Sequence, residues 1–259
     1  MRRSTFALAL AAGLSATGAA YAQDLNPVHR HKQFESPQHF AAEIRFAPYW
    51  PDIDSDPAFA ALAPANRPYA STFGNRPWAR LLFGFEVDWQ IVRVPHVGSA
   101  GVGGFLGYTQ MSAPAMKSDG TASSANSNLE IFPFYGVGVF RFDGPMRDFG
   151  IPVVPYVKLG LGWGYWHTGV DGVGNSVGTN ASGEKVAGEG LSWGPHVAFG
   201  AALQLDVFDR RAARALDENL GINHTYAYIE GMYSGMGITS SRQLRIGTTT
   251  WVLGLAVEF

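Results

Sequence analysis

Trp251-Val252-Leu253-Gly254-Leu255-Ala256-Val257-Glu258-Phe259 closes the chain, and its apolar side chains fall on every odd position. Successive side chains of a β-strand point to opposite faces. One face therefore carries Trp251, Leu253, Leu255, Val257 and Phe259, and the other carries Gly254, Ala256 and Glu258. An apolar face beside a small or polar face suits a strand between lipid and a barrel interior. The segment thus predicts the closing strand of a transmembrane β-barrel.

The amino terminus supports export from the cytoplasm. Arg2 and Arg3 precede an apolar stretch over residues 6–14, and Ala20-Tyr21-Ala22 follows a run of small residues. This is the layout of a signal peptide, which predicts a leader over residues 1–22. We expect residues 23–37 to form a periplasmic segment and residues 38–259 to form the barrel. The terminal aromatic also resembles the signal read by the bacterial outer-membrane assembly machinery.

Composition excludes several classes of protein. There is no Cys, so neither a disulfide nor a lipid-anchored cysteine is expected. The formal charge of −2 becomes −4 when Arg2 and Arg3 leave with the leader, which does not favour nucleic-acid binding. The 32 Gly residues and 13% aromatics, with only 15% charged residues, are unusual for a soluble α/β enzyme and fit closely packed strands.

Period-two alternation between turn signals predicts eight strands, most of them long enough to cross a membrane when tilted. They cover residues 38–49, 78–92, 98–111, 128–142, 152–167, 191–208, 222–235 and 248–259. The fold class predicted is therefore all-β: an eight-stranded, antiparallel, up-and-down transmembrane barrel. The facing of strand 128–142 stays ambiguous, because Ile131-Phe132-Pro133-Phe134-Tyr135 is apolar on both faces.

The connections alternate in length, as in bacterial outer-membrane barrels. The four long ones, residues 50–77, 112–127, 168–190 and 236–247, are expected outside the cell, with both termini in the periplasm. Residues 93–97 and 143–151 read as short turns. Residues 209–221 instead predict one short periplasmic helix, with Asp209 as its N-cap and Gly221 as its stop. For its Arg210, Arg211 and Arg214 two interpretations remain open: contact with membrane phosphates or a periplasmic partner, or a helix that closes the barrel mouth.

Aromatic residues at strand ends predict two interfacial belts. The outer belt comprises Trp50, Trp78, Trp163, Trp166, Trp193, Trp251, Tyr49, Tyr108, Tyr165 and Tyr233. The inner belt comprises Phe40, Trp89, Phe142, Phe208 and Phe259. The alternative is that these rings fill the core of a soluble, lipocalin-like barrel.

An eight-stranded barrel is filled by its own side chains, so no open channel is expected. Parity predicts a polar network in the lumen, made of Glu43, Arg45, Glu86, Asp88, Lys158, Glu230 and Glu258, with Tyr156, Gln204 and Tyr228 beside it. Buried charges need partners, and Arg45 and Lys158 are the available cations. A proton or ion path is the alternative to a purely structural network.

Two short patterns suggest chemistry. Asp52-Ile53-Asp54-Ser55-Asp56 has the alternating carboxylates of a calcium loop, but Pro57 and Ala63 replace its Gly and its bidentate Glu, so at most a weak divalent-ion site is expected. His167, Ser192 and His196 lie near the outer rim and would serve an esterase-like, lipid-modifying site. No motif fixes a nucleophile, a base and an oxyanion donor together, so we expect no catalytic residues, no metal and no cofactor.

Four segments together resemble a family of small outer-membrane barrels described from myxobacteria and related bacteria. They are residues 47–55 (APYWPDIDS), residues 154–162 (VPYVKLGLG), the Arg/Ala-rich 209–217 with 221–226 (GINHTY), and the closing strand. The resemblance implies the barrel fold and the membrane and brings no established activity. We therefore expect a monomeric outer-membrane barrel in contact with membrane lipid and lipopolysaccharide, with a structural or loop-binding role; a lipid-modifying enzyme and a narrow pore are the alternatives.

Overall fold

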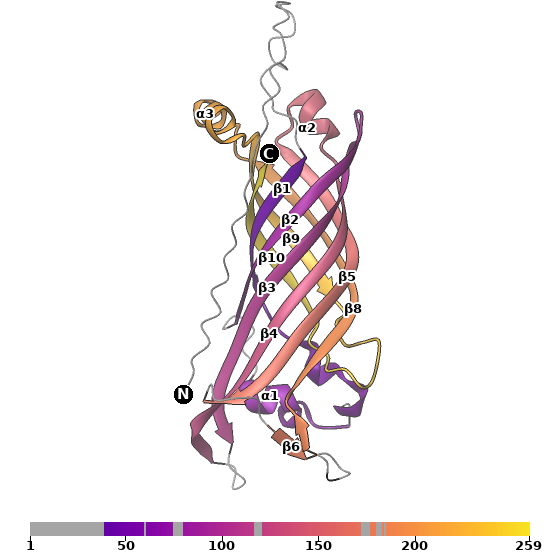
Figure 1. Cartoon of the computed structure of the whole chain (residues 1–259), viewed down its shortest axis with the longest axis vertical. Helices are drawn as coiled ribbons and strands as arrows, with labels where there is room; N and C mark the ends of the chain where they lie inside the picture. Colours follow the sequence, from indigo (N-terminus) through magenta and orange to yellow (C-terminus); the bar gives the residue numbers. More distant parts are fainter. Residues whose placement is uncertain are drawn as a thin grey trace, which may run out of the picture. The chain divides into compact units, whose positions relative to one another are not determined.

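A computed structural model describes residues 39–259 apart from 60, 75–79, 117–120, 172–176, 180–182 and 184. The expected leader, the 23–37 segment and Trp78 lie outside the described residues. The described chain forms one closed antiparallel barrel with the strand order β1-β10-β9-β8-β5-β4-β3-β2 (Figure 1). The predicted fold, an eight-stranded up-and-down barrel, is confirmed.

All eight predicted strands are present. Their bounds are β1 Phe40–Pro48, β2 Leu81–Val94, β3 Gly98–Met116, β4 Ala122–Arg141, β5 Val153–Val170, β8 Glu189–Gln204, β9 His224–Ser234 and β10 Thr248–Glu258. β3 and β4 are longer than predicted and stay paired as far as Met116 and Ala122. Most of the predicted loop 112–127 is therefore a hairpin, because its polar Ser and Asn residues pair along an exposed ladder where no lipid demands an alternating pattern.

The closing strand pairs with the first strand, as its position predicts. Ala41 lies opposite Glu258, and Phe40 and Phe259 exchange two backbone hydrogen bonds of 2.9 Å. We call the end of the barrel that holds these two residues the C-terminal mouth, and the opposite end the loop mouth. Trp251, Leu253, Leu255 and Phe259 are exposed on the outer wall, whereas Val252, Ala256 and Glu258 are buried inside.

The structure has more helix than the single one predicted. α3, Arg210–Leu220, lies where it was expected, and Asp209 accepts hydrogen bonds from the backbone N–H groups of Arg211 and Ala212. α1, Pro68–Phe73, and α2, Gly144–Phe149, are additional, and 3-10 turns cover Asp52–Ser55, Pro57–Phe59 and Pro64–Asn66. Six-residue helices are too short to show a helical period in sequence. No helix in the described part of the chain combines the length and apolar character needed to cross a membrane.

Small elements extend from both mouths (Figure 1). α1 and a two-stranded sheet, β6 Val177–Thr179 with β7 Lys185–Ala187, lie at the loop mouth. α2 and α3 lie at the C-terminal mouth. No residue of α3 is buried, and the helix lies to one side of the strands in Figure 1, which does not favour a helix that closes the mouth.

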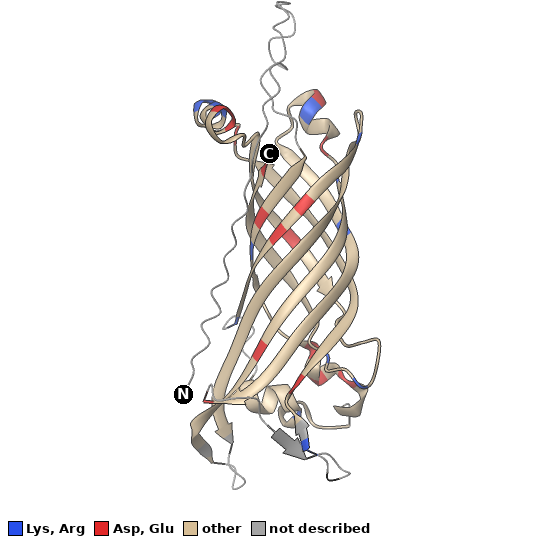
Figure 2. Ribbon diagram, viewed as in Figure 1, with Lys and Arg blue, Asp and Glu red and all other residues tan. Residues whose placement is uncertain are grey.

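The outer wall is apolar along the strands. In β2 the exposed side chains are Leu81, Phe83, Phe85, Val87, Trp89 and Ile91, and Figure 2 shows few charged positions on the strands nearer the loop mouth. The ambiguous strand is also settled: Ile131 and Tyr135 face inward, and Phe132 and Phe134 are exposed. A closed barrel with such a wall presents the surface that lipid requires.

The predicted aromatic belts are partly wrong. Trp193, Trp251, Tyr108, Tyr165 and Tyr233 are exposed, as are all five members of the inner belt. Tyr49 is fully buried, and Trp50 and Trp166 pack against the interior. Parity points Trp166 inward on β5, and the segment after β1 folds over the loop mouth and takes Tyr49 and Trp50 with it.

Candidate functional site

Eight charged side chains fill the half of the lumen next to the C-terminal mouth. We call this set the lumen charge network; its members are Glu43, Arg45, Glu86, Asp88, Arg141, Lys158, Glu230 and Glu258, each at most 8% exposed. Seven of them are the residues proposed from the sequence. They converge because β1, β2, β4, β5, β9 and β10, which carry them, belong to the same closed ring of strands. The barrel therefore gathers these charges in one half of its interior.

Lys158 and Arg45 hold the centre of the network. The Lys158 ammonium donates to Glu43 Oε2 at 2.8 Å and to Glu86 Oε1 at 2.6 Å, and lies 3.7 Å from Glu230 Oε2. The Arg45 guanidinium donates a hydrogen bond from one nitrogen to Glu86 and from another to Glu230. Glu43 and Glu86 are direct cross-strand neighbours, which alone would be repulsive. Lys158 bridges their carboxylates and offsets that repulsion.

Arg141 organises the acids nearest the C-terminal mouth. Its guanidinium lies 2.5 Å from Asp88 Oδ2, 3.0 Å from Glu43 Oε1 and 3.5 Å from Glu258 Oε1. The amide of Gln90 and the hydroxyl of Tyr226 also donate to Glu258, at 2.8 and 3.0 Å. Glu43 thus connects the two parts of the network, because it bonds to both Lys158 and Arg141.

Sequence reasoning missed Arg141. The facing of its strand was left open, although Val137 and Val139, both buried, share its parity and would have pointed Arg141 inward. With Arg141 the network has three cations against five carboxylates. The structure thus supplies a third partner that the sequence interpretation lacked.

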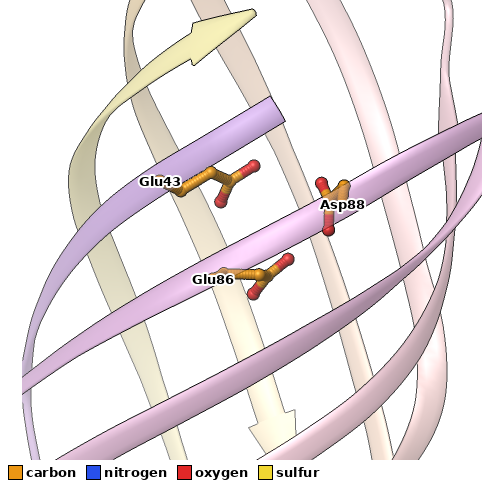
Figure 3. Close-up of side chains that lie close together, drawn as sticks. All are labelled: Glu43, Glu86 and Asp88. Atoms are coloured by element: carbon orange, nitrogen blue, oxygen red, sulfur yellow. The ribbon is translucent and has the colours of Figure 1, made fainter. Parts of the chain in front are cut away.

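Glu43, Glu86 and Asp88 bring three carboxylates within 4.8 Å of one another, the arrangement of a possible cation site (Figure 3). Lys158 bonds to the first two of these residues, and Arg141 bonds to the first and third. Side-chain cations therefore occupy the positions where a metal ion would neutralise this cluster. The geometry favours a self-contained salt-bridge network over a metal centre.

Two small cavities flank Arg141 in the C-terminal half of the lumen. One, about 20 Å³, is lined by Glu43, Glu258 and Tyr226 among others, and the second, about 10 Å³, touches Asp88 and Gln90. A cavity of this kind needs about 10–15 Å³ for one water molecule. The network accordingly has room for isolated waters that would solvate its excess negative charge, and no room for a solute.

The half of the lumen next to the loop mouth is closed by an aromatic plug, by which we mean Tyr49, Tyr69, Phe105, Tyr135, Met236 and Ile246. All are at most 1% exposed. Phe105 stacks on Tyr135 with ring centroids 5.0 Å apart, and Tyr135 stacks on His196 at 4.0 Å. The Tyr49 hydroxyl donates to the Ile246 carbonyl at 2.5 Å, and burial raises the pKa of Tyr49 well above its usual value. Tyr49 therefore remains a neutral donor.

Arg80 fastens the segment after β1 to the barrel. Its guanidinium lies 5.5 Å from the Trp50 ring, 5.2 Å from Tyr69 and 5.7 Å from Phe73, and donates to the Phe73 carbonyl. Burial raises the pKa of Tyr69 to about 12, although the Arg80 charge opposes this shift. Cation–π contacts of a desolvated Arg can contribute about 2 kcal/mol. They hold α1 over the loop mouth.

A second polar cluster lies at the C-terminal mouth, where β8 leads to α3. Asp206 accepts hydrogen bonds from the Thr225 hydroxyl at 2.8 Å and the Gln204 amide at 3.0 Å, and lies 2.7 Å from His224 Nδ1. Burial alone would raise the pKa of Asp206, but the hydrogen bonds from His224, Thr225 and Gln204 lower it below its ordinary value. The cluster fixes the turn that precedes α3.

The three residues considered for catalysis do not form one site. Ser192 and His196 are buried inside the barrel, four residues apart on β8, which places their Cα atoms about 13 Å apart. The Ser192 hydroxyl donates to the Leu244 carbonyl at 2.7 Å. His167 lies beside the exposed Phe132, with its Nε2 3.6 Å from Glu130 Oε2. The barrel wall separates His167 from the other two.

The carboxylates of the calcium-like pattern do not converge either. Asp54 accepts from the backbone N–H groups of Tyr69 and Ala70, at 2.7 and 2.8 Å, and so caps α1. Asp56 accepts from the Ala58 N–H at 2.9 Å and pairs with Arg245 at 3.6 Å. Burial raises the pKa of Asp52, which Arg245 partly opposes. These side chains organise the loop instead of surrounding an ion.

Comparison with known proteins gives neither a matching family model nor a matching curated protein. Among solved structures, the outer membrane protein OprG of Pseudomonas aeruginosa is 11% identical, with a TM-score of 0.49, over 88% of this chain and 98% of that one. Ail of Yersinia pestis, solved with a heparin analogue, is 12% identical, with a TM-score of 0.39, over 86% and 97%. The N-terminal β-barrel domain of P. aeruginosa OprF is 12% identical, with a TM-score of 0.31, over 86% and 98%. Sequence identities and TM-scores this low do not allow a ligand or an activity of these proteins to be assigned to this chain.

Proposed function

We propose that this protein is a bacterial outer-membrane barrel that works as a closed scaffold for its outer loops. The observation that carries the proposal is the filled lumen. The lumen charge network occupies one half, the aromatic plug occupies the other, and the two cavities beside Arg141 hold about 20 and 10 Å³. The apolar outer wall supports the membrane location.

The orientation that we propose places the loop mouth outside the cell and the C-terminal mouth in the periplasm. An even number of strands brings Phe40 and Phe259 to the same mouth, where they are hydrogen-bonded. The connections after β1, β5 and β9 are long and lie at the other mouth, as is usual in outer-membrane barrels, and the connection after β8, which carries α3, is the exception at the C-terminal mouth. Protease added to intact cells should cut a tag inserted at the exposed Gly183 and spare one inserted at the exposed Gly150. The reverse pattern would overturn this orientation.

The outer surface would be formed by α1, the described ends of β3 and β4 at the loop mouth, the β6–β7 sheet and residues 235–247. Rigid barrels commonly display functional loops in this way. We propose lipopolysaccharide or another surface component as the partner of these loops, a monomeric state, and recognition of the terminal Phe259 by the assembly machinery. The four segments that resemble small barrels from myxobacteria and related bacteria support placing this chain among such proteins.

Conductance measurements test the closed lumen. We expect the purified barrel to give no single-channel events in planar bilayers, because a solute would have to displace both the paired charges and the plug. A matched variant, Tyr69→Ala with Tyr135→Ala, removes two plug rings and is expected to increase the frequency of brief openings. Steady conductance of the unaltered protein would overturn the scaffold proposal in favour of a narrow pore.

We also propose that the protein is not an enzyme. The separation of His167 from Ser192 and His196 by the barrel wall supports this. Lipid A from cells lacking the protein should give the same mass spectrum as lipid A from the parent cells. A lipid-modifying activity would instead be established if the spectrum changed in cells lacking the protein and the unaltered protein restored it. The Ser192→Ala variant would then fail to restore it.

A further inference from the structure

α3 leaves the barrel instead of covering it. The helix follows β8 through Asp206 and Phe208, begins after the Asp209 cap and ends at Gly221, whose φ is 67°. No residue of α3 is buried, and Figure 1 shows the helix displaced sideways from the strands at the C-terminal mouth. In a membrane-embedded barrel, an element in this place lies over the surrounding lipid.

The helix has two distinct faces. Ala212, Leu216 and Leu220 follow one another at four-residue spacing and form an apolar row. Arg210, Arg214 and Glu218 form a second row at the same spacing, with Arg211 beside it. At 100° per residue the two rows lie on opposite sides of the helix. This pattern is typical of helices that lie in a membrane interface.

Both ends of the helix carry exposed apolar side chains. Phe208, just before it, is 74% exposed and Leu220, its last residue, is 67% exposed. They continue the apolar outer wall, because Leu203, Val207 and Phe259 are exposed at the same mouth. Exposed apolar side chains on both the lipid-facing wall and the adjoining helix indicate that lipid covers both.

The charges of the helix oppose its dipole. Its three arginines lie in the first two turns, where the helix end is electropositive, and Asp217 and Glu218 lie in the last turns, where it is electronegative. None of the three arginines makes an ion pair within the described part of the chain. A local arrangement that is unfavourable in isolation indicates that an external group compensates it. The group that fits is an anion.

We propose that Phe208 and α3 form an interfacial anchor, in which Arg210, Arg211 and Arg214 bind the phosphates of anionic phospholipid headgroups at the C-terminal mouth. Leu220 and Phe208 insert at the edge of the acyl region, and the arginines extend along the headgroup layer. The inference rests on the membrane location proposed above. It adds a lipid-binding site that the scaffold role does not require.

The absence of Cys allows site-specific spin labels to test this position. Ala212→Cys places a nitroxide on the apolar row, and Glu218→Cys places one roughly 120° away on the charged row. In vesicles of phosphatidylcholine and phosphatidylglycerol at 7:3, the label at position 212 should be several-fold more accessible to oxygen than to a water-soluble nickel chelate, and the label at 218 should show the reverse. Equal nickel accessibility at both sites would overturn the anchor.

Lipid selectivity tests the arginines. The ratio of association constants for spin-labelled phosphatidylglycerol and phosphatidylcholine should exceed about five for the unaltered protein. It should fall at least about fivefold when Arg210, Arg211 and Arg214 are changed to Gln, because each Arg near an anionic surface contributes about 1 kcal/mol. The matched control, Arg242→Gln at the loop mouth, should change the ratio by less than half as much.

The outcomes separate this inference from the proposed function. Heat-dependent migration in SDS gels reports whether each variant forms the folded barrel, and all variants should remain folded. Folded variants with unchanged lipid selectivity would overturn the anchor and leave the membrane barrel intact. Failure of the unaltered protein to insert into vesicles of either composition would instead overturn the membrane location itself.

Discussion

Toward the C-terminal mouth the lumen is filled by five carboxylates and three cations, whereas toward the loop mouth it is filled by aromatic and aliphatic side chains. Both halves are closed, and both consist of residues buried almost completely. In the first half each side chain needs a particular partner, because an unpaired buried charge is costly. In the second half the side chains need only shape and volume, because dispersion and burial are not directional.

This difference between the two halves of the lumen predicts which substitutions destabilise each half. The lumen charge network depends on single links such as Lys158, which contacts three carboxylates. The aromatic plug distributes its stability over many contacts, between residues of β3 and β4 and residues of two connections, β1–β2 and β9–β10. Substitutions of similar size should therefore have unequal effects in the two halves.

Lys158→Met should have the largest effect. Met roughly preserves the volume but leaves Glu43 and Glu86 without the ammonium between them, and breaking a buried pair in this way costs about 3–5 kcal/mol. We expect a marked fall in the temperature at which the folded band disappears from SDS gels. Lys185→Met, at an exposed position, should have no effect.

Adding Glu43→Gln to Lys158→Met should recover part of the loss, since it removes one of the stranded charges. No recovery would mean that packing rather than charge pairing stabilises this half. The comparison between the two halves would then fail.

Arg80→Gln should come next, at about 2 kcal/mol, because it removes a desolvated cation from three aromatic rings. The expected loss is local, so chymotrypsin should cut within residues 50–74 faster than in the unaltered barrel. Arg67→Gln, half-buried in the same segment and outside these three cation–π contacts, serves as the control. An unchanged cutting rate would show that α1 is held by other contacts.

Tyr49→Phe should cost about 1 kcal/mol, the usual value of one buried hydrogen bond. The variant keeps the ring in the plug and removes only the donor to the Ile246 carbonyl. Urea unfolding midpoints would measure the difference, with the exposed Tyr165→Phe as the matched control. A loss above about 3 kcal/mol would show that the plug also depends on single polar links.

Asp206→Asn should have the smallest effect at neutral pH, about 0.5 kcal/mol, because Asn retains part of the hydrogen bonding. The folded-state pKa of Asp206 is lowered, so its contribution is present above the unfolded pKa, near 3.9, and is lost as pH falls through the folded value. Between pH 7 and pH 3 the unaltered barrel should lose more stability than Asp206→Asn. The exposed Glu218→Gln variant is the control and should lose as much stability over this pH range as the unaltered barrel. Equal losses in the unaltered barrel, Asp206→Asn and Glu218→Gln would contradict the prediction.

The strands were predictable because each is a local pattern. Alternation along β2 and β10 reports directly on what lies at each face of a strand. The pattern failed in strand 128–142, where Phe132, Phe134 and Tyr135 are apolar on both faces. It failed there because an aromatic side chain fits the plug as well as it fits lipid. Arg141 was missed because the facing of its strand was therefore left open.

The candidate site was predictable only as a set of inward side chains. Their parity follows from the sequence, but their ion-pair partners depend on the register between strands that are distant in sequence. The pair of Lys158 and Glu43 is an example. The plug was harder still, because Tyr49, Tyr69 and Ile246 come from connections with no periodicity. Their turn signals show where a strand stops and not where the following residues go.

The sequence by itself determined the barrel, the identity of its strands and, outside strand 128–142, the face that each strand turns to lipid, because these depend on the period of two within each segment. It also determined the helix after Asp209 through its caps. Only the tertiary structure decided that Arg141 completes the lumen charge network, that the connections fold inward as an aromatic plug, and that α3 turns outward. The first two outcomes depend on closure of the ring, which brings together residues far apart in sequence, such as Arg141 with Glu258 and Tyr49 with Ile246.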